Sequence, residues 1–379
     1  MKIVQTNKAY YPKVGGIETT ITNLSEGLVR DHNVEVEVLT CNNQRSSEYM
    51  KKKINRVEVT YLPTFGFVAS LPISISYMDY LSKLTGDVLH IHEPFPWADL
   101  SYLFSKKIRS NFSKLVVSWH SDIVRQKWAL SFYRPFIHKF LTLADKILVS
   151  NKNLIDYSEY LPDYKSKCEV IPLGAKLDWI GETENRKDNV QKIKSAHSSP
   201  MVLFVGRLVY YKGIQYLIEA ISKLLDVKLV IIGSGPLHQK LLNQINNLNL
   251  SERIKILPEV DEETLYSYYE ACDIFVLPSV EKSETYGIVQ IEAMACGKPV
   301  VCTELKTGTT FINQHEKTGL VVPPRDSNAL AEAIKKLILN DGLRIELGKN
   351  AKQRALMEFT AEKMVDRTFT VYKDLLSRV

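Results

Sequence analysis

The sequence has no long apolar segment, no paired cysteines and no export signal. No run of about 18 apolar residues occurs, which argues against a membrane-spanning helix. The first residues, MKIVQTNKAYYPK, lack the apolar core and cleavage site of a signal peptide. The five cysteines form no C-x-x-C motif, which is typical of free thiols in a reducing compartment. We therefore expect a cytoplasmic protein.

The second half of the sequence also lacks net charge, whereas the first half is basic. Residues 177–379 hold 26 basic and 26 acidic residues, whereas residues 1–176 hold 23 basic and 17 acidic residues. Segment 100–140 is the extreme case, with eight basic residues, nine aromatic residues and a single acid, Asp122. This mixture suits an anionic membrane surface at the inner face of the cytoplasmic membrane. A solvated basic helix face over an aromatic core would have the same composition. No nucleic-acid-binding module is recognisable, so we expect no nucleic acid partner.

The 379 residues are too many for one ordinary core, which predicts two domains. In both halves, short Val/Ile/Leu-rich runs alternate with longer helical stretches, as in parallel sheets buried on both faces. Strands are expected at 2–6, 34–40, 57–62, 87–92, 114–119, 146–150 and 168–174, then at 200–207, 227–235, 253–257, 273–279, 298–303 and 318–324. Helices are expected at about 212–225, 326–339, 342–357 and 361–378.

This alternation predicts an α/β fold with two doubly wound Rossmann-like domains facing a cleft. Residues 1–176 would form the first domain and 177–360 the second, with the helix 361–379 packing back on the first. The polar stretch 175–199 is the expected linker. Ligands of such folds bind beyond the carboxyl ends of the strands, so the residues at those ends are the candidates for function.

One candidate stretch is SETYGIVQIEAMACGKPVV, which follows the strand 273–279. Glu284 lies in the loop, Gly287 opens the expected helix, and Glu292 falls about one and a half turns into it. Two carboxylates can accept hydrogen bonds from the hydroxyls of a polyol, and free helix N–H groups between them favour an anion. A glutamate that complements the helix dipole and a second, solvated glutamate would explain the same residues without a ligand.

Two further stretches carry groups that suit phosphates. In FVGRLVYYKG, Arg207 and Lys212 follow a buried strand, where two cations can neutralise a diphosphate. In YYPKVGGIE, Gly15-Gly16 would let backbone N–H groups approach a phosphate closely. Surface charge and a simple turn are the ordinary alternatives.

The ends of two first-domain strands carry histidines. SWHSD places His120 and Asp122 after the strand 114–119, and HIHEP places His92 and Glu93 after the strand 87–92. A histidine at a strand end is more often structural than catalytic. Both a structural and a catalytic role are therefore possible for these histidines.

Taken in order, these motifs resemble the retaining glycosyltransferases of family 4, which have two Rossmann domains in the GT-B architecture. The motifs are Gly15-Gly16 with Glu18, then His120, then Arg207 with Lys212, and finally Glu284 with Glu292. The last is the most specific, because the match extends through the pattern Glu-x-Tyr-Gly-x4-Glu-Ala-Met-Ala-x-Gly-x-Pro-Val. HSDIVRQK and GTTFINQHEKTGLVVPP further resemble O-antigen mannosyltransferases.

The resemblance implies a role for each residue. Catalytic roles would fall to Glu284, His120, Arg207 and Lys212. Donor-binding roles would fall to Gly15, Gly16, Arg207, Lys212, Val260, Glu284, Tyr286, Gly287, Ile288 and Glu292. Glu284 would bind hydroxyls of the donor sugar and Glu292 the ribose of the nucleotide. His120 would lie against the sugar near the reacting carbon, and Asp122 near the acceptor.

No Asp-x-Asp element occurs in the chain, so we expect neither a metal nor another cofactor, with Arg207 and Lys212 in the metal's place. The resemblance implies GDP-mannose as the first donor candidate. The aromatic, basic segment 100–140 leads us to expect a growing surface glycan linked to a polyprenyl diphosphate as acceptor. A UDP-hexose or UDP-N-acetylhexosamine donor and a non-hydrolysing sugar-nucleotide epimerase of the same fold are the alternatives. A sugar-binding protein without chemistry and a glycoside hydrolase using the two glutamates fit less well.

Overall fold

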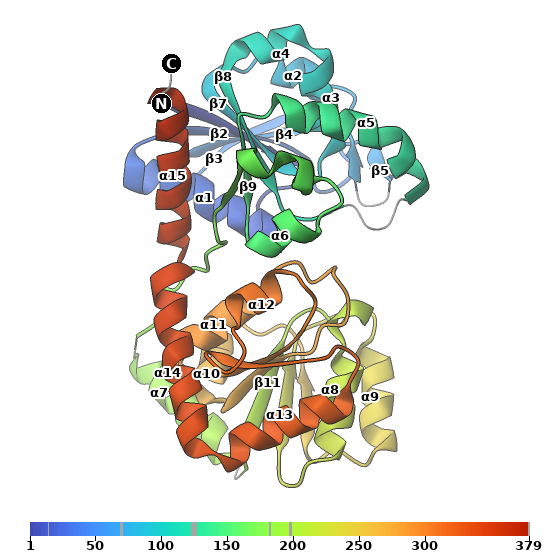
Figure 1. The fold of residues 1–379 in the computed structure, drawn as a ribbon, viewed down its shortest axis with the longest axis vertical. Helices are drawn as coiled ribbons and strands as arrows, with labels where there is room; N and C mark the ends of the chain where they lie inside the picture. Colours follow the sequence, from blue (N-terminus) through green and yellow to red (C-terminus); the bar gives the residue numbers. More distant parts are fainter. Residues whose placement is uncertain (14, 69–70, 123–126, 182, 197–198, 378–379) are drawn as a thin grey trace. The chain divides into compact units, whose positions relative to one another are not determined.

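The computed structural model describes residues 1–379 except 14, 69–70, 123–126, 182, 197–198 and 378–379, and for 127–131 it describes the backbone alone. The chain divides into two compact units (Figure 1). Unit 1 contains residues 1–176 and 361–379, and unit 2 contains residues 177–360. These are the ranges expected from the sequence, whereas the acceptor and donor roles assigned to them stay predictions.

Unit 1 is built on an eight-stranded sheet in the order β10-β9-β8-β7-β1-β2-β4-β3. Its strands are β1 (Lys2–Asn7), β2 (Glu35–Cys41), β3 (Met50–Ile54), β4 (Val57–Leu62), β7 (Gly86–Glu93), β8 (Phe112–Trp119), β9 (Lys146–Val149) and β10 (Cys168–Val170). All neighbours pair in parallel except β3 and β4. Side chains alternate between two apolar clusters, so that Ile3 packs in one and Val4 in the other. The continuous apolar runs of the sequence therefore mark strands that are buried on both faces.

Helices cover both faces of this sheet. They are α1 (Gly16–His32), α2 (Tyr77–Leu81), α3 (Pro96–Phe104), α4 (Lys106–Asn111), α5 (Lys127–Leu143), α6 (Lys152–Tyr157), the 3-10 helix η1 (Leu161–Lys167) and α15 (Ala361–Ser377). The C-terminal helix α15 lies beside α1 (Figure 1). The contact is close because Gly27 has no side chain, and a Cβ there would stand 2.5 Å from a methyl of Val365.

Unit 2 repeats the plan with a six-stranded, fully parallel sheet in the order β13-β12-β11-β14-β15-β16. Its strands are β11 (Met201–Val205), β12 (Lys228–Ile232), β13 (Ile254–Leu257), β14 (Ile274–Leu277), β15 (Val300–Thr303) and β16 (Gly319–Val322). Its helices are α7 (Glu184–Ser195), η2 (Tyr210–Lys212), α8 (Ile214–Ser222), α9 (His238–Asn247), α10 (Glu262–Ala271), α11 (Val289–Ala295), α12 (Gly308–Ile312), α13 (Ser327–Leu339) and α14 (Asp341–Glu358). Both units therefore have the predicted Rossmann-like α/β architecture.

Several elements were not expected from the sequence, and the supposed linker is one of them. The supposed linker contains α7, which packs on α10 and is held there by Arg186 paired with Glu263 at 2.7 Å. A polar helix with one buried arginine has no apolar stripe to reveal it. The lysine-rich edge strand β3 and the small hairpin of β5 (Gly66–Val68) and β6 (Leu71–Ile73) were not expected either. No helix in the described part of the chain has the length and apolar character needed to cross a bilayer.

Candidate active site

The predicted cation and carboxylate of unit 2 meet in a buried ion pair. Lys212 Nζ lies 2.6 Å from Glu284 Oε2, and the two side chains are 10% and 8% exposed. Ser279 donates a hydrogen bond of 2.8 Å to the same carboxylate oxygen. Lys212 ends the loop after β11, and Ser279 and Glu284 follow β14, the neighbouring strand. The carboxyl ends of two parallel strands thus bring together residues that lie 72 positions apart.

Gly213 makes this approach possible. Its φ is +67°, and a Cβ there would stand 2.1 Å from the carbonyl oxygen of Pro278. Any other residue would be strained and would push the loop away from β14. The two loops are further joined by the Val280 N–H, which donates to Tyr211 O at 2.8 Å. The Lys–Gly dipeptide of the sequence motif therefore places the ammonium group next to the carboxylate.

Arg207 lies on the same loop, with an exposed side chain, directly after Gly206. Burial raises the pKa of Tyr211, and the positive charges of Lys212 and Arg207 act in the opposite direction. Both cations thus lie within electrostatic range of one phenol at the carboxyl end of β11. Because Glu284 neutralises Lys212 in the structure, Arg207 supplies the excess positive charge of this loop.

Glu292 lies in the first turn of α11, earlier than expected, because the helix begins at Val289 and not at Gly287. The φ of +82° at Gly287 interrupts the helical conformation at that position. Tyr269 donates a hydrogen bond of 2.6 Å from its hydroxyl to Glu292 Oε2. Burial raises the pKa of Glu292 to about 7. Tyr269 is a partner that sequence reasoning missed, because it reaches Glu292 from α10.

The other residues predicted at the donor site lie nearby in unit 2. Ile288 directly precedes α11, and Val260 precedes α10 with a partly buried side chain. Tyr286 is 3% exposed, and its ring packs so closely that a Cβ at Gly308 would stand 2.4 Å from it. The structure thus gives Tyr286 a packing role, and its contact with a donor stays a prediction.

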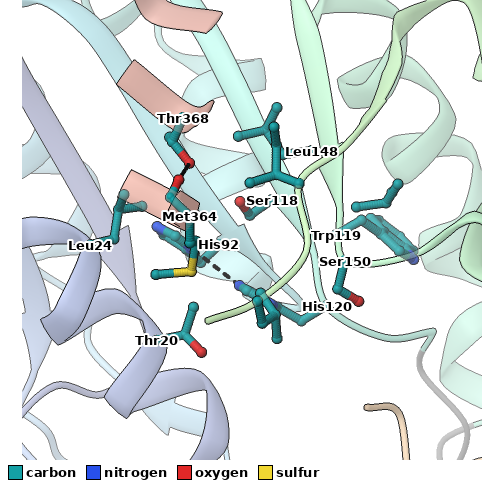
Figure 2. Close-up of a pocket in the computed structure, with 13 residues that line it drawn as sticks. Thr20, Leu24, His92, Ser118, Trp119, His120, Leu148, Ser150, Met364 and Thr368 are labelled. Carbon is teal, nitrogen blue, oxygen red and sulfur yellow. Dashed lines mark hydrogen bonds between the residues drawn. The ribbon is translucent and has the colours of Figure 1, made fainter. Parts of the chain in front are cut away.

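In unit 1, His120 is the end of a row of buried polar side chains. His120 Nε2 lies 3.0 Å from His92 Nδ1, and His92 Nε2 lies 3.1 Å from Gln5 Oε1 (Figure 2 shows the first contact). The rings of His92 and His120 stack with centroids 5.3 Å apart. Burial lowers the pKa of His120 to about 4 and that of His92 well below its ordinary value. Both imidazoles are therefore neutral at pH 7.

A second buried histidine adjoins this row. His90 hydrogen-bonds to the hydroxyl groups of Ser118 at 2.8 Å and of Tyr372 at 2.6 Å. Tyr372 belongs to α15, so the last helix of the chain completes the polar core of unit 1. Burial lowers the pKa of His90 to about 3. No local sequence signal connects position 90 with position 372.

The Gly15-Gly16 loop is occupied by a carboxylate of its own chain. A Cβ on Gly15 would stand 2.4 Å from Glu18 Oε2, while nothing lies within 4 Å of the corresponding position at Gly16. Glu18 is buried in the first turn of α1, where a negative charge complements the helix dipole. A phosphate at Gly15 would meet this carboxylate, so only the Gly16 side is open to a ligand.

Asp122 makes structural hydrogen bonds with both carboxylate oxygens. Trp119 Nε1–H and the Ser158 hydroxyl donate to Oδ1 at 2.9 and 2.6 Å. The Glu159 N–H donates to Oδ2 at 2.8 Å. Asp122 thus fastens the segment before η1 to the end of β8, and its contact with an acceptor stays a prediction without support from these bonds.

Segment 100–140 divides into core and surface. Its buried aromatic residues are Tyr102, Phe112, Trp119 and Phe140. Its exposed aromatic residues are Phe104, Phe132 and Phe136, and its exposed basic residues are Lys106, Lys107, Arg134 and Lys139. Arg125 and the side chains of Lys127 and Trp128 fall outside the described residues. Phe132, Phe136 and Lys139 share one face of α5, and Phe104 packs on Phe136 with ring centroids 5.8 Å apart. We call this the α5 surface.

Comparison with solved structures identifies the class of fold. Sucrose-phosphate synthase from Thermosynechococcus elongatus has a TM-score of 0.79 with this chain, with both chains covered completely at 22% sequence identity. This likeness shows the fold, which is the GT-B architecture of glycosyltransferases.

Comparison of sequences identifies the family. Residues 14–179 match the model of Glycosyltransferase Family 4, and residues 185–354 match that of Glycosyl transferases group 1. O-antigen chain mannosyltransferase C from Escherichia coli is 31% identical over 99% of both chains. D-rhamnosyltransferase WbpZ from Pseudomonas aeruginosa is 32% identical over 95% of this chain and 93% of its own. The chain belongs to the family 4 glycosyltransferases.

Proposed function

We propose that the protein transfers a hexose from a nucleotide sugar to a hydroxyl of a growing, lipid-linked surface glycan, with retention of configuration at the sugar. Mannose from GDP-mannose is the first candidate for the donor. The O-antigen mannosyltransferase and the rhamnosyltransferase among the relatives support the substrate class. The observation that carries the proposal is the buried contact of Lys212 with Glu284 at the carboxyl ends of β11 and β14.

Such a transfer needs positive charge at the leaving group. As the bond between sugar and diphosphate breaks, negative charge grows on the leaving oxygen and positive charge on the sugar carbon. Fixed cations in a site poor in water stabilise the leaving oxygen by several kcal/mol. Arg207 and Lys212 are the cations that would hold the diphosphate, and this arrangement needs no metal ion.

The Lys212–Glu284 pair suits an exchange of partners on donor binding. With the site empty, each ion compensates the other, which avoids an unpaired buried charge. A donor offers a diphosphate to Lys212 and sugar hydroxyls to Glu284. Both buried charges thus keep partners in the complex. The Ser279 hydroxyl keeps its hydrogen bond to the carboxylate and fixes its position.

Glu292 and Tyr269 suit the ribose. A carboxylate with one oxygen held by a phenol can accept from ribose hydroxyls with the other oxygen. On retention, the acceptor hydroxyl attacks the face from which the diphosphate leaves. Its proton passes to the departing diphosphate oxygen, so the step needs no separate base. His120 would contribute on the sugar side.

The α5 surface supports an acceptor at the membrane. Exposed aromatic rings beside Lys139 match the interface of an anionic bilayer, where rings enter the headgroup region and a lysine pairs with lipid phosphates. A polyprenyl-diphosphate-linked glycan would be presented there. The proposal therefore includes a peripheral location at the inner face of the cytoplasmic membrane.

A thermal-shift panel of GDP, UDP, ADP and their sugars tests the donor. A ligand at 100 times its Kd stabilises the native state by about 2.7 kcal/mol, so the true donor should raise the midpoint by several degrees. We expect the largest shift with GDP-mannose and transfer to a polyprenyl-linked acceptor. Preference for a UDP sugar would select the alternative donor, and isomerisation of the donor without an acceptor would select the epimerase.

Arg207→Ala tests the chemistry, with Lys255→Ala as the control because Lys255 is an exposed cation on β13 of the same unit. We expect a loss of about 10²-fold or more in kcat for Arg207→Ala and no change for Lys255→Ala. Unchanged turnover in the Arg207 variant would refute the proposed role of the cations.

Liposome sedimentation tests the membrane contact. The double variant Phe132→Ser/Phe136→Ser should lose binding to vesicles containing phosphatidylglycerol. The matched control is Leu225→Ser/Leu339→Ser, since these leucines of unit 2 are 90% and 75% exposed. Equal sedimentation of the wild type with anionic and neutral vesicles would count against the α5 surface as a membrane site.

A further inference from the structure

The row from Gln5 to His120 connects three neighbouring strands of unit 1. Gln5 comes from β1, His92 from β7 and His120 from the residue after β8, and these strands are adjacent in the sheet. The hydrogen bonds of 3.1 and 3.0 Å join the three side chains, which are 0%, 1% and 6% exposed. Water is therefore largely excluded from these contacts, and each side chain depends on the next for its hydrogen bonds.

The charged and titratable groups around the row leave it neutral. Burial is the main cause of the low pKa of His92, and the neighbouring His90 and His120 lower it further. For His120 the main cause is again burial, and the ammonium group of Lys8 adds to it. The ring of His90 stands 4.2 Å from that of His92. A neutral imidazole has one nitrogen that donates and one that accepts.

Neutrality lets a single acceptor orient the whole row. Gln5 presents its Oε1, which can only accept, so His92 Nε2 must carry the proton. His92 Nδ1 is then the acceptor, so His120 Nε2 must carry the proton and donate it. The remaining nitrogen of His120, Nδ1, is left with its lone pair.

We propose that Gln5 and His92 are positioning residues that hold His120 in the tautomer protonated at Nε2, with the lone pair of Nδ1 offered to the reacting sugar. A lone pair accepts a hydrogen bond from a sugar hydroxyl and adds no positive charge beside a carbon that is becoming positive. The use of His120 in the reaction rests on the proposed function. The assignment of its tautomer does not.

Packing alone does not fix the ring of His120. His92 and His120 line a cavity of about 20 Å³ together with Ser150, Met364 and Thr368 (Figure 2). This is room for about one water molecule, so the space beside the ring is not filled by side chains. The hydrogen bond to His92 is therefore the contact that sets the orientation of the ring and the position of its proton.

The test is nitrogen NMR of the full-length protein with ¹⁵N-labelled histidines, at pH 7 and without substrate. In the wild type we expect His120 Nε2 to give the shift of a protonated nitrogen and Nδ1 that of an unprotonated one. The Gln5→Leu variant removes the acceptor that Gln5 offers to His92. A proton at His92 Nε2 would then be buried without a partner, so we expect His92 to carry its proton at Nδ1 and His120 to change to the tautomer protonated at Nδ1.

The kinetic readout follows from the same change. For Gln5→Leu we expect kcat to fall by about 10²-fold, in the range of lost acid–base positioning, with an unchanged KM for the donor. Tyr372→Phe is the matched control, because it removes a buried hydrogen bond from His90 and leaves the row intact. It should keep the wild-type tautomer of His120 and near-normal kcat.

Two results would overturn the proposal. One is a wild-type His120 protonated at Nδ1, which would mean that the amide of Gln5 is turned and its Nε2 donates to His92. In the structure this Nε2 is buried and has no hydrogen-bond partner among the described residues. The other is an unchanged His120 tautomer in Gln5→Leu. The wild-type spectrum alone shows whether His120 is protonated at Nδ1, even if the variant does not fold. The spectra also report the tautomer when the donor panel finds no nucleotide sugar, so the two proposals fail separately.

Discussion

Both units bury polar side chains near the carboxyl ends of their strands, but these side chains are charged in unit 2 and neutral in unit 1. Each has a largely parallel sheet whose central strands carry a cluster of buried polar side chains toward their carboxyl ends. In unit 2 the cluster is charged, with Lys212 against Glu284 and Arg207 on the same loop. In unit 1 it is neutral, with histidines and a glutamine joined by hydrogen bonds. The difference indicates what each can bind: a charged cluster can exchange an internal ion for a ligand's anion, and a neutral one can orient a lone pair.

The largest effect should come from removing the charge of unit 2. Lys212→Met keeps the length of the side chain but leaves Glu284 buried without its cation. We expect kcat/KM for the donor to fall by about 10²–10³-fold, since a lost cation at a developing anion has that effect. Loss of a buried ion partner should also lower the thermal midpoint.

The control for this variant is Lys336→Met. Lys336 forms an ion pair of 3.0 Å with Glu316, but both side chains are more than half exposed. Exposed pairs contribute roughly 0–1 kcal/mol, so the midpoint and the kinetics should hardly change. Equal effects of the two variants would show that burial does not distinguish the pair at the site.

Asp122→Asn should give the next largest effect, which is a loss of stability confined to unit 1. The amide group of asparagine replaces one of the two accepting oxygens with an NH₂ group, which is a donor. This NH₂ group would face either the donors Trp119 Nε1–H and Ser158 O–H or the Glu159 N–H. We expect a loss of about 2 kcal/mol in stability, measured as a lower thermal midpoint. The thermal shift produced by the nucleotide donor should persist, because Asp122 holds only unit 1 together. Loss of the donor shift would contradict the separation of the two units.

The third prediction concerns Glu292 in unit 2 and the pH dependence of the free energy of unfolding. The pKa of Glu292 is about 7 in the fold against 4.5 for an ordinary glutamic acid, so the native state holds a proton that the unfolded chain releases. Its contribution is fully present below pH 4.5 and is lost as the pH rises through 7. Glu292→Gln should remove this decline of about 3 kcal/mol, measured by urea unfolding at several pH values. The exposed Glu332→Gln should leave the pH profile unchanged.

Tyr372→Phe should have the smallest effect. It leaves His90 Nδ1 without its partner at 2.6 Å, inside a core that excludes water. We expect a cost of about 1 kcal/mol and a small decrease in midpoint, without a change in donor affinity. A loss as large as that of Lys212→Met would mean that α15 does more than complete the core of unit 1.

Much of the fold could be predicted from the sequence, because parallel strands that are buried on both faces consist of continuous apolar runs. The strands of both sheets except β3 were found this way, and the helices α8, α13, α14 and α15 were also predicted. The helix α7 was missed because Arg186, and not an apolar stripe, holds it in place. The edge strand β3 was missed because its lysines face solvent.

The sequence by itself determined which residue types stand at the strand ends and in which order, since local motifs record turns, glycines and charges. It could therefore name Lys212, Glu284, Glu292 and His120 one at a time. Only the tertiary structure decided their partners: Lys212 with Glu284, Glu292 with Tyr269, and His120 with His92 and Gln5. The physical reason is that a parallel sheet aligns the carboxyl ends of strands that are distant along the chain. The hydrogen bonds and charges formed there depend on that alignment and leave no local trace.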